Sequence, residues 1–165
     1  MIQKKDDRFS GQNISRILVA AKLISKDQAQ SLLKKEKQAR RILVKQQSDS
    51  RDRTNSMTRR PGRAISFIDV VVYLKIERLD KSGAVLDEDL IFKTVATAWK
   101  IPYKKIDPLK LELNLVTGTI SKSFAIKHML LPLTVEEGKL IVATPDPFNE
   151  EAMRDIEMVS KLKVN

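Results

Sequence analysis

The chain has 165 residues, with 31 lysines and arginines, 21 aspartates and glutamates, one histidine and no cysteine. This length allows one domain, or two small ones, with a real hydrophobic core. The absence of cysteine excludes disulfides, thiolate nucleophiles and cysteine zinc sites, and the lone His128 excludes a two-histidine metal cluster. The apolar runs are too short to cross a bilayer and the N-terminus has no secretory signal, so we expect a soluble cytoplasmic protein.

The positive charge lies in the first 64 residues. Residues 1–64 hold 17 Lys and Arg against 6 Asp and Glu, a net charge of +11, whereas residues 65–165 hold 14 against 15, a net charge of −1. We therefore expect a basic N-terminal module followed by a nearly neutral globular one. The asymmetry points to an acidic partner, which could be a protein, a nucleic acid or anionic lipid headgroups.

Two helices are predicted at the start of the chain. The first follows from a spacing of i, i+3, i+4 and i+7 in the apolar residues Ile14, Ile17, Leu18 and Ala21. Ser25 and Gln28 match a capping box that begins the second, whose apolar side holds Ala29, Leu32, Leu33 and Leu43. Its outer side carries Lys34, Lys35, Lys37, Arg40 and Arg41. We expect an antiparallel helical hairpin over residues 12–45, within a first module of residues 1–45.

Residues 46–64 are predicted to form a flexible basic linker, because Met57 and Ala64 are their only apolar residues. A second domain is then expected over residues 65–165. Residues 68–79 follow a helical period, although their valines also suit a strand, and Gly83 is a candidate C-cap. Asp87 is the expected N-cap of a further helix that ends near Trp99, which should close the core.

The last third of the chain mixes helix and strand signals. We expect a helix over residues 121–129, then a β-hairpin of residues 130–135 and 139–144. Asn149 should cap another helix, and Lys163 should start a third strand that the chain end cuts off, as in a fragment of a longer protein. The predicted fold class is α+β: an N-terminal helical hairpin followed by a small α/β domain with a β-hairpin and a β-α-β tail.

No enzyme hypothesis survives a search for catalytic motifs. Gly138-Lys139 would end a phosphate-binding loop only with glycine at position 133 and Ser or Thr at position 140, and both positions are leucine. His128 has no nucleophile motif nearby, and the acidic runs are explained by helix capping and turns. We therefore predict no catalytic, cofactor-binding or metal-binding residues.

The basic N-terminal region leaves three alternatives open. Its cations could form a solvated helix face with a disordered tether, a surface for a protein partner, or a contact with RNA or DNA phosphates. Phe9 is the only aromatic residue in the first 64, so base stacking has no support.

The second half of the chain resembles a known domain. Residues 83–90 resemble the G-L-I-x-x-x-x-L helix start in the N-terminal domains of type II secretion and type IV pilus assembly ATPases, and residues 99–103 resemble the G-L-P-Y that follows. The same MshEN-type domain has a run A…x-L-P-L…G-x-L-x-V-A…D-P-x-N, matched here by Ala125, residues 131–133, residues 138–143 and residues 146–149. The resemblance covers about residues 68–165, and residues 14–36 look like a degenerate earlier copy of the helical motif.

Some members of this family bind cyclic di-GMP through two such copies, each opening with Arg-Leu-Gly. Here the two openings are Asn13-Ile14-Ser15 and Leu74-Lys75-Ile76, so the arginines are missing. Lys22 replaces the first inner glycine while Gly83 keeps the second, and the closing glutamine is replaced by Glu36 and Thr97. Because of these departures we do not expect cyclic di-GMP binding, which stays as the alternative function.

The resemblance implies a non-catalytic docking domain of a bacterial secretion or pilus ATPase, cytoplasmic and held at the inner membrane through a partner. The implied partner is the cytoplasmic domain of a GspL-like platform protein. The same resemblance places ATP, Mg²⁺ and hexamer formation in a motor domain downstream of this segment. We expect nucleic acid binding to be the least favoured function, and an acidic partner to be steered by five residues, Arg16, Lys34, Lys35, Arg40 and Arg41.

Overall fold

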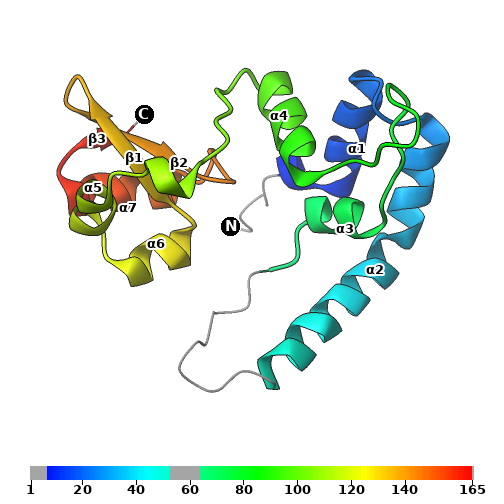
Figure 1. The fold of residues 1–165 in the computed structure, drawn as a ribbon, viewed down its shortest axis with the longest axis horizontal. Helices are drawn as coiled ribbons and strands as arrows, with labels where there is room; N and C mark the ends of the chain where they lie inside the picture. The colour runs from blue at the N-terminus through cyan, green and yellow to red at the C-terminus, as the bar shows by residue number, and fades with distance from the viewer. Residues whose placement is uncertain (1–6, 53–63, 165) are drawn as a thin grey trace, which may run out of the picture. The chain divides into compact units, whose positions relative to one another are not determined.

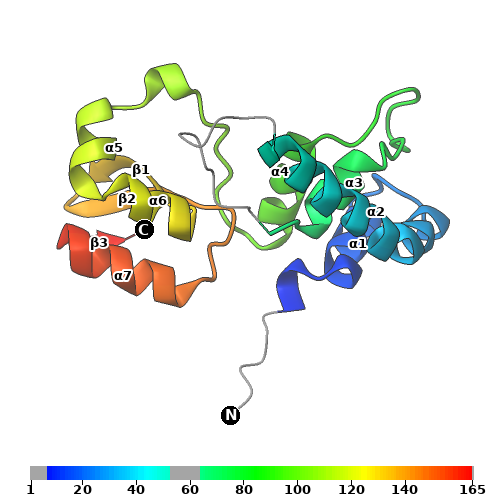
Figure 2. The ribbon, with the colours of Figure 1, turned by 90° about the horizontal axis from the view of Figure 1, so that it is seen from below.

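The computed structural model describes residues 7–52 and 64–164 and divides the chain into two compact units, Met1–Tyr103 and Lys104–Asn165. The first unit is helical, and the second combines helices with a small sheet (Figure 1 and Figure 2). The predicted α+β class is confirmed. The boundary between the units differs from the one expected near residue 64, because residues 65–103 pack with the N-terminal helices.

The first unit contains a 3-10 turn η1 (Asp7–Phe9) and four helices, α1 (Gly11–Ala20), α2 (Lys26–Asp52), α3 (Phe67–Tyr73) and α4 (Glu88–Ala98). Each helix start is fixed by a polar side chain that accepts from a free backbone N–H: Ser10, Ser25, Ser66 and Asp87. Ser25 and Gln28 form the predicted capping box, and Asp87 is the predicted N-cap of α4.

Three helices of this unit are followed by a lysine in the left-handed conformation. Lys22, Lys75 and Lys100 have φ values of 59°, 49° and 57°. After α1 and α4 the next backbone N–H bonds back five residues, from Leu23 to Leu18 and from Ile101 to Ala96, which is the Schellman pattern. The chain thus turns sharply without glycine at these three places.

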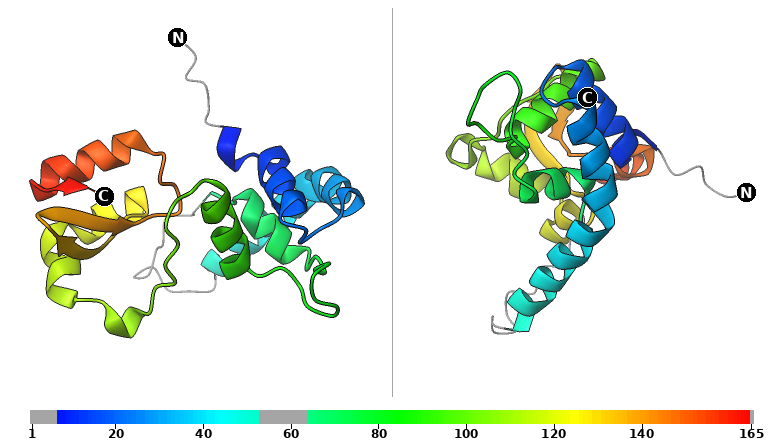
Figure 3. Two further views of the ribbon diagram at one scale, coloured as in Figure 1. Left: turned by 90° about the horizontal axis from the view of Figure 1, so that it is seen from above. Right: turned by 90° about the vertical axis from the view of Figure 1, so that its right-hand side faces the viewer.

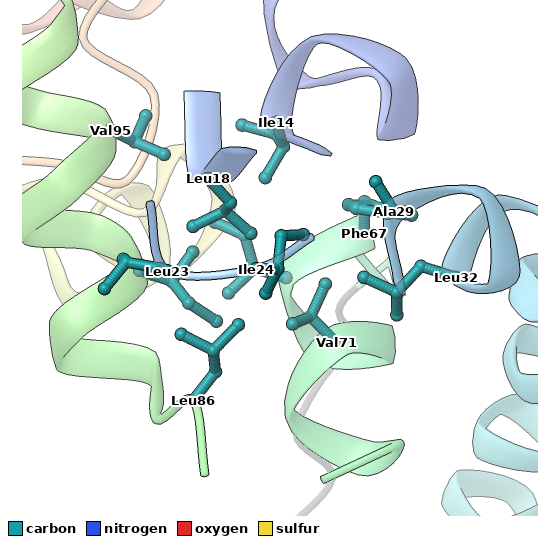
Figure 4. Close-up of a cluster of buried hydrophobic side chains, with 12 residues drawn as sticks. Ile14, Leu18, Leu23, Ile24, Ala29, Leu32, Phe67, Val71, Leu86 and Val95 are labelled. Carbon is teal, nitrogen blue, oxygen red and sulfur yellow. The ribbon is translucent and has the colours of Figure 1, made fainter. Parts of the chain in front are cut away.

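The core of the first unit is built from all four helices (Figure 4). Ile14 and Leu18 of α1 meet Leu32 of α2, and the cluster continues with Phe67 and Val71 of α3 and Ile91 and Val95 of α4. The expected two-helix module therefore is not a separate body. The apolar faces of α1 and α2 are too wide for the two helices to bury against each other alone. Helices α3 and α4 bury the rest of these faces.

The predicted ends of two helices differ from the structure. Helix α2 extends to Asp52 instead of stopping near residue 45, and α3 ends at Tyr73 instead of continuing to residue 79. Gly83 is not a helix C-cap. It lies at φ 73° in a loop whose backbone is held by the bridge between Glu77 and Val85. The rest of the expected linker, residues 53–63, lies outside the described residues.

The second unit contains a 3-10 turn η3 (Pro108–Lys110), the helices α5 (Leu113–Thr119), α6 (Lys122–His128) and α7 (Glu150–Ser160), and three strands. β1 (Leu131–Glu136) pairs antiparallel with β2 (Lys139–Ala143), which pairs parallel with β3 (Lys163–Val164). The predicted hairpin, the Asn149 cap and the third strand are confirmed. Leu140 of β2 and Ile156 of α7 are fully buried in its core.

Candidate partner-docking surface

The two sides of α2 have opposite chemistry. Its inner side buries Ala29, Leu32 and Ala39 against the other helices of the unit. Its outer side is exposed and basic, with Lys34, Lys35, Lys37, Arg41 and Lys45. In Figure 1 and Figure 3 the second half of α2 runs beyond α1, α3 and α4.

The five residues predicted to steer a partner do not form one surface. Arg16 is exposed on α1, and Lys34, Lys35 and Arg41 are exposed on α2. At 100° per residue, Lys34 and Arg41 share one line along the helix, whereas Lys35 is turned by about 100° to one side. Only part of the predicted set therefore faces the same direction.

Arg40 differs from the other four because its guanidinium is already used within the unit. Its Nη2 lies 2.8 Å from Oε1 of Glu36, one helical turn before it, and its Nη1 donates to the backbone carbonyl of Ile65. These contacts tie α2 to the segment that leads into α3. Arg40 is thus a structural residue rather than a free cation for a partner.

A shallow hollow is present on the second half of α2. Its lining residues are Lys37, Arg40, Arg41 and Val44, so three basic side chains surround one apolar side chain. Val44 is 49% exposed, and Ile42, which lies on the other side of Arg41 around the helix, is 37% exposed. The hollow therefore combines positive charge with a small apolar wall.

Four exposed cations on the outer side of α2 form a basic ridge: Lys34, Lys37, Arg41 and Lys45. Their spacing of three and four residues places them on one face of the helix. Among residues 8–48 and 64–164, none of the four belongs to an ion pair. Lys37 and Lys45 are absent from the predicted docking set, although the i, i+3, i+7 and i+11 spacing from Lys34 could have found them.

The residues at the positions of the cyclic di-GMP motif are buried in the first unit or make contacts within it. Ser15 is 2% exposed inside the unit, and its hydroxyl has no hydrogen-bond partner in the part of the chain that the structure describes. Glu36 pairs with Arg40, and the Thr97 hydroxyl donates to the Lys93 carbonyl. Lys22 adopts the left-handed conformation that glycine at this place would favour. At the positions of Ser15, Glu36 and Thr97 the side chains are thus buried or bonded within their own unit.

The remaining polar residues point to structural roles. His128 is stacked at 4.5 Å on the Phe124 ring, and its Nε2 lies 3.9 Å from Oδ2 of Asp155. In the described residues no group of three His, Cys, Asp or Glu side chains is placed to hold a metal ion. No helix among them has the length and apolar character needed to cross a membrane.

Two carboxylates have a lowered pKa, each because of a local hydrogen bond. The guanidinium of Arg78 donates to Asp80 at 2.9 Å and lowers the pKa of that carboxyl. The backbone N–H of Val164 and the ammonium of Lys163 donate to Glu157 and lower its pKa. The Glu157 contacts hold the start of β3 to the end of α7.

The comparison with protein families concerns the C-terminal part of the chain. The MshEN domain model matches residues 99–165. This stretch is therefore similar to an MshEN domain. The predicted resemblance to the N-terminal domains of type II secretion and type IV pilus assembly ATPases is confirmed, and the match covers the second unit with the five residues before it.

A curated relative matches part of the chain. The chain is 29% identical over 58 residues to the type IV pilus assembly ATPase TfpB of Acinetobacter baylyi, a match that covers 35% of this chain and 10% of TfpB. The chain thus spans only about a tenth of this curated relative.

Two solved structures resemble the chain as a whole. The structure of MshE with cdg has a TM-score of 0.57 at 14% identity and covers 92% of this chain and 86% of that one. The structure of the N-terminal domain of XpsE has a TM-score of 0.47 at 16% identity, over 94% and 84% of the two chains. The MshE likeness shows that the chain has a known fold.

Proposed function

We propose that this segment is a non-catalytic docking part of a type II secretion or type IV pilus assembly ATPase, and that it binds the cytoplasmic domain of a GspL-like platform protein at the inner membrane. The observation that carries the proposal is the presence, in one chain, of a segment similar to the MshEN domain and a helical unit whose basic ridge makes no ion pair with the side chains of residues 8–48 and 64–103. ATP, Mg²⁺ and hexamer formation would belong to another part of the same polypeptide.

The net charges of the two units indicate which of them attracts an acidic partner. The first unit holds 22 Lys and Arg against 12 Asp and Glu, whereas the second holds nine of each. An acidic partner is therefore attracted to the first unit. Such attraction raises association rates more than it lowers dissociation rates, and salt screens it.

The contribution of apolar surface to docking is small. An apolar helix face that a partner could cover is not available on α1 or on the first half of α2, since the unit's own core covers these faces. The exposed apolar side chains of α2 are Ile42 and Val44, both beside the basic ridge. Docking would thus rest on charge with a small apolar contribution.

The test is the binding of the 165-residue chain to the immobilised cytoplasmic domain of the platform protein from the same bacterium, measured at 50 and 500 mM NaCl. We expect binding whose association rate falls steeply with salt. A variant with Arg16, Lys34, Lys35 and Arg41 changed to Glu should associate more slowly, with Arg40 left intact because it holds α2 to Ile65. Absence of binding at low salt would contradict the proposal.

Cyclic di-GMP sensing is the second candidate, favoured by the fold shared with MshE, whose structure contains cdg. The positions aligned with the motif speak against it, because Asn13 and Leu74 stand where a guanine-stacking arginine would open each copy. Calorimetry with cyclic di-GMP decides between the two functions. Binding in the micromolar range or tighter would favour the sensor.

A further inference from the structure

The basic ridge of α2 has a shape and a chemistry that select among anionic partners. We propose that the ridge inserts into an acidic groove on a folded partner protein, with Ile42 and Val44 against the groove walls. This inference rests on the proposed docking function and specifies which surface docks and what shape of partner it fits.

The part of α2 that carries the ridge has few carboxylates of its own, so a partner is expected to supply them. Between residues 34 and 48 the only acidic residue is Glu36, and its carboxylate is used by Arg40. The four cations of the ridge are exposed and unpaired among the described residues. A partner without negative charge would leave four cations facing it, and burying them unpaired would be costly.

The ridge presents its charges at a regular spacing. Lys37, Arg41 and Lys45 follow at intervals of four residues, or about 6 Å along the helix axis, and the ridge from Lys34 to Lys45 rises about 16 Å. Carboxylates at i and i+4 on a helix, or at alternate positions on a strand, repeat at about the same distance. The walls or floor of a protein groove can therefore match the ridge charge by charge.

The flanks of the ridge favour a concave partner. At 100° per residue, Ile42 lies about 100° to one side of Arg41 and Val44 about 60° to the other. A flat partner surface that contacts the basic ridge reaches its cations but leaves at least one of these apolar side chains in water. A groove encloses both, and it gives each an apolar wall.

The chemistry of the flanks disfavours nucleic acid. A phosphate backbone pairs with cations but offers no apolar surface to Ile42 and Val44. Residues 34–48 contain no aromatic side chain on which a base could stack. The hollow lined by Lys37, Arg40, Arg41 and Val44 instead suits a carboxylate that has an aliphatic neighbour.

The experiment uses the 165-residue chain and the platform cytoplasmic domain at 150 mM NaCl. The ridge variant carries K34E, K37E, R41E and K45E, and circular dichroism checks that it is folded. The matched control reverses four exposed lysines elsewhere, K93E, K122E, K127E and K139E, and so has the same net charge. A third variant, I42Q with V44Q, keeps every charge. Duplex DNA of 20 base pairs and phosphatidylglycerol vesicles serve as the other anionic probes.

We expect the ridge variant to bind the platform at least tenfold more weakly than the control does, and the apolar variant to lose severalfold in affinity through faster dissociation. Equal binding by the ridge variant and the control would overturn the inference while leaving the docking function intact. An apolar variant that binds like wild type would overturn the groove. Tighter ridge-dependent binding to DNA or to vesicles than to the platform would overturn it as well. If wild type does not bind the platform at all, both proposals fail.

Discussion

The guanidinium of Arg40 on α2 donates a hydrogen bond to the backbone carbonyl of Ile65, 25 residues further along the chain. The same side chain pairs with Glu36, so the two contacts hold the inner side of α2 next to the beginning of α3. Ile65 is buried there with Ala39 and Val70. One arginine of a basic helix thus has a structural role, while its neighbour Arg41 remains exposed.

Replacing Arg40 by glutamine should lower the free energy of unfolding by about 1 kcal/mol, because a charge-assisted hydrogen bond to a carbonyl is lost. The matched control is Arg41→Gln, which removes the same charge from an exposed position without an ion pair among the described residues. Urea unfolding followed by circular dichroism measures both. Equal changes in the free energy of unfolding for the two substitutions would show that the contacts of Arg40 with Ile65 and Glu36 do not stabilise the fold.

Gly11 lies where α1 approaches both α2 and α3. A Cβ atom added there would come within 2.8 Å of the Phe67 ring and of Oε2 of Glu36. Gly11→Ala should therefore destabilise the first unit by about 1–3 kcal/mol, the usual cost of overpacking. Gly118→Ala is the control, because the space around Gly118 in α5 is open and alanine favours a helix, so stability should rise slightly. Thermal unfolding of both variants gives the comparison.

The buried hydroxyl of Ser15 has no hydrogen-bond partner in the described residues, which makes the native serine costly. Ser15→Ala should raise the free energy of unfolding by about 1 kcal/mol. The opposite result is expected for Ser121→Ala, since Ser121 caps α6 through the backbone N–H of Phe124 and losing a cap costs about 1 kcal/mol. A loss of stability in Ser15→Ala would mean that the hydroxyl is satisfied by a bound water.

Glu157 should make the stability of the second unit depend on pH. Its pKa is lowered in the folded state by the N–H of Val164 and by Lys163, so its contribution is fully present above the unfolded value near 4.5 and is lost as the pH falls through the lower folded value. Glu157→Gln should therefore be less stable than wild type at pH 7, and the difference should shrink by pH 3. Chemical unfolding at both values measures it. A constant difference would contradict a role for the charge of Glu157.

Local signals in the sequence identified most elements of both units. Ser25 with Gln28, Asp87 and Asn149 were recognised as helix starts because capping depends on residues three positions apart. The hairpin of β1 and β2 was found because alternation and turn residues are local as well. The docking set was only partly predictable: helical spacing places Lys34 and Arg41 on one face, but no local pattern shows that Arg40 reaches Ile65.

The charge asymmetry, the helix caps, the β-hairpin and the resemblance to the ATPase N-terminal domain can all be read from the amino-acid sequence, since each depends on residue types at short separations. The boundary between the two units cannot be read from it, and it follows from the packing of the folded chain. That boundary depends on which apolar faces meet: Leu86 and Ile91, far along the chain, bury themselves against Ile14 and Leu18 rather than against the sheet. The same packing leaves the four cations of the basic ridge on the exposed side of α2.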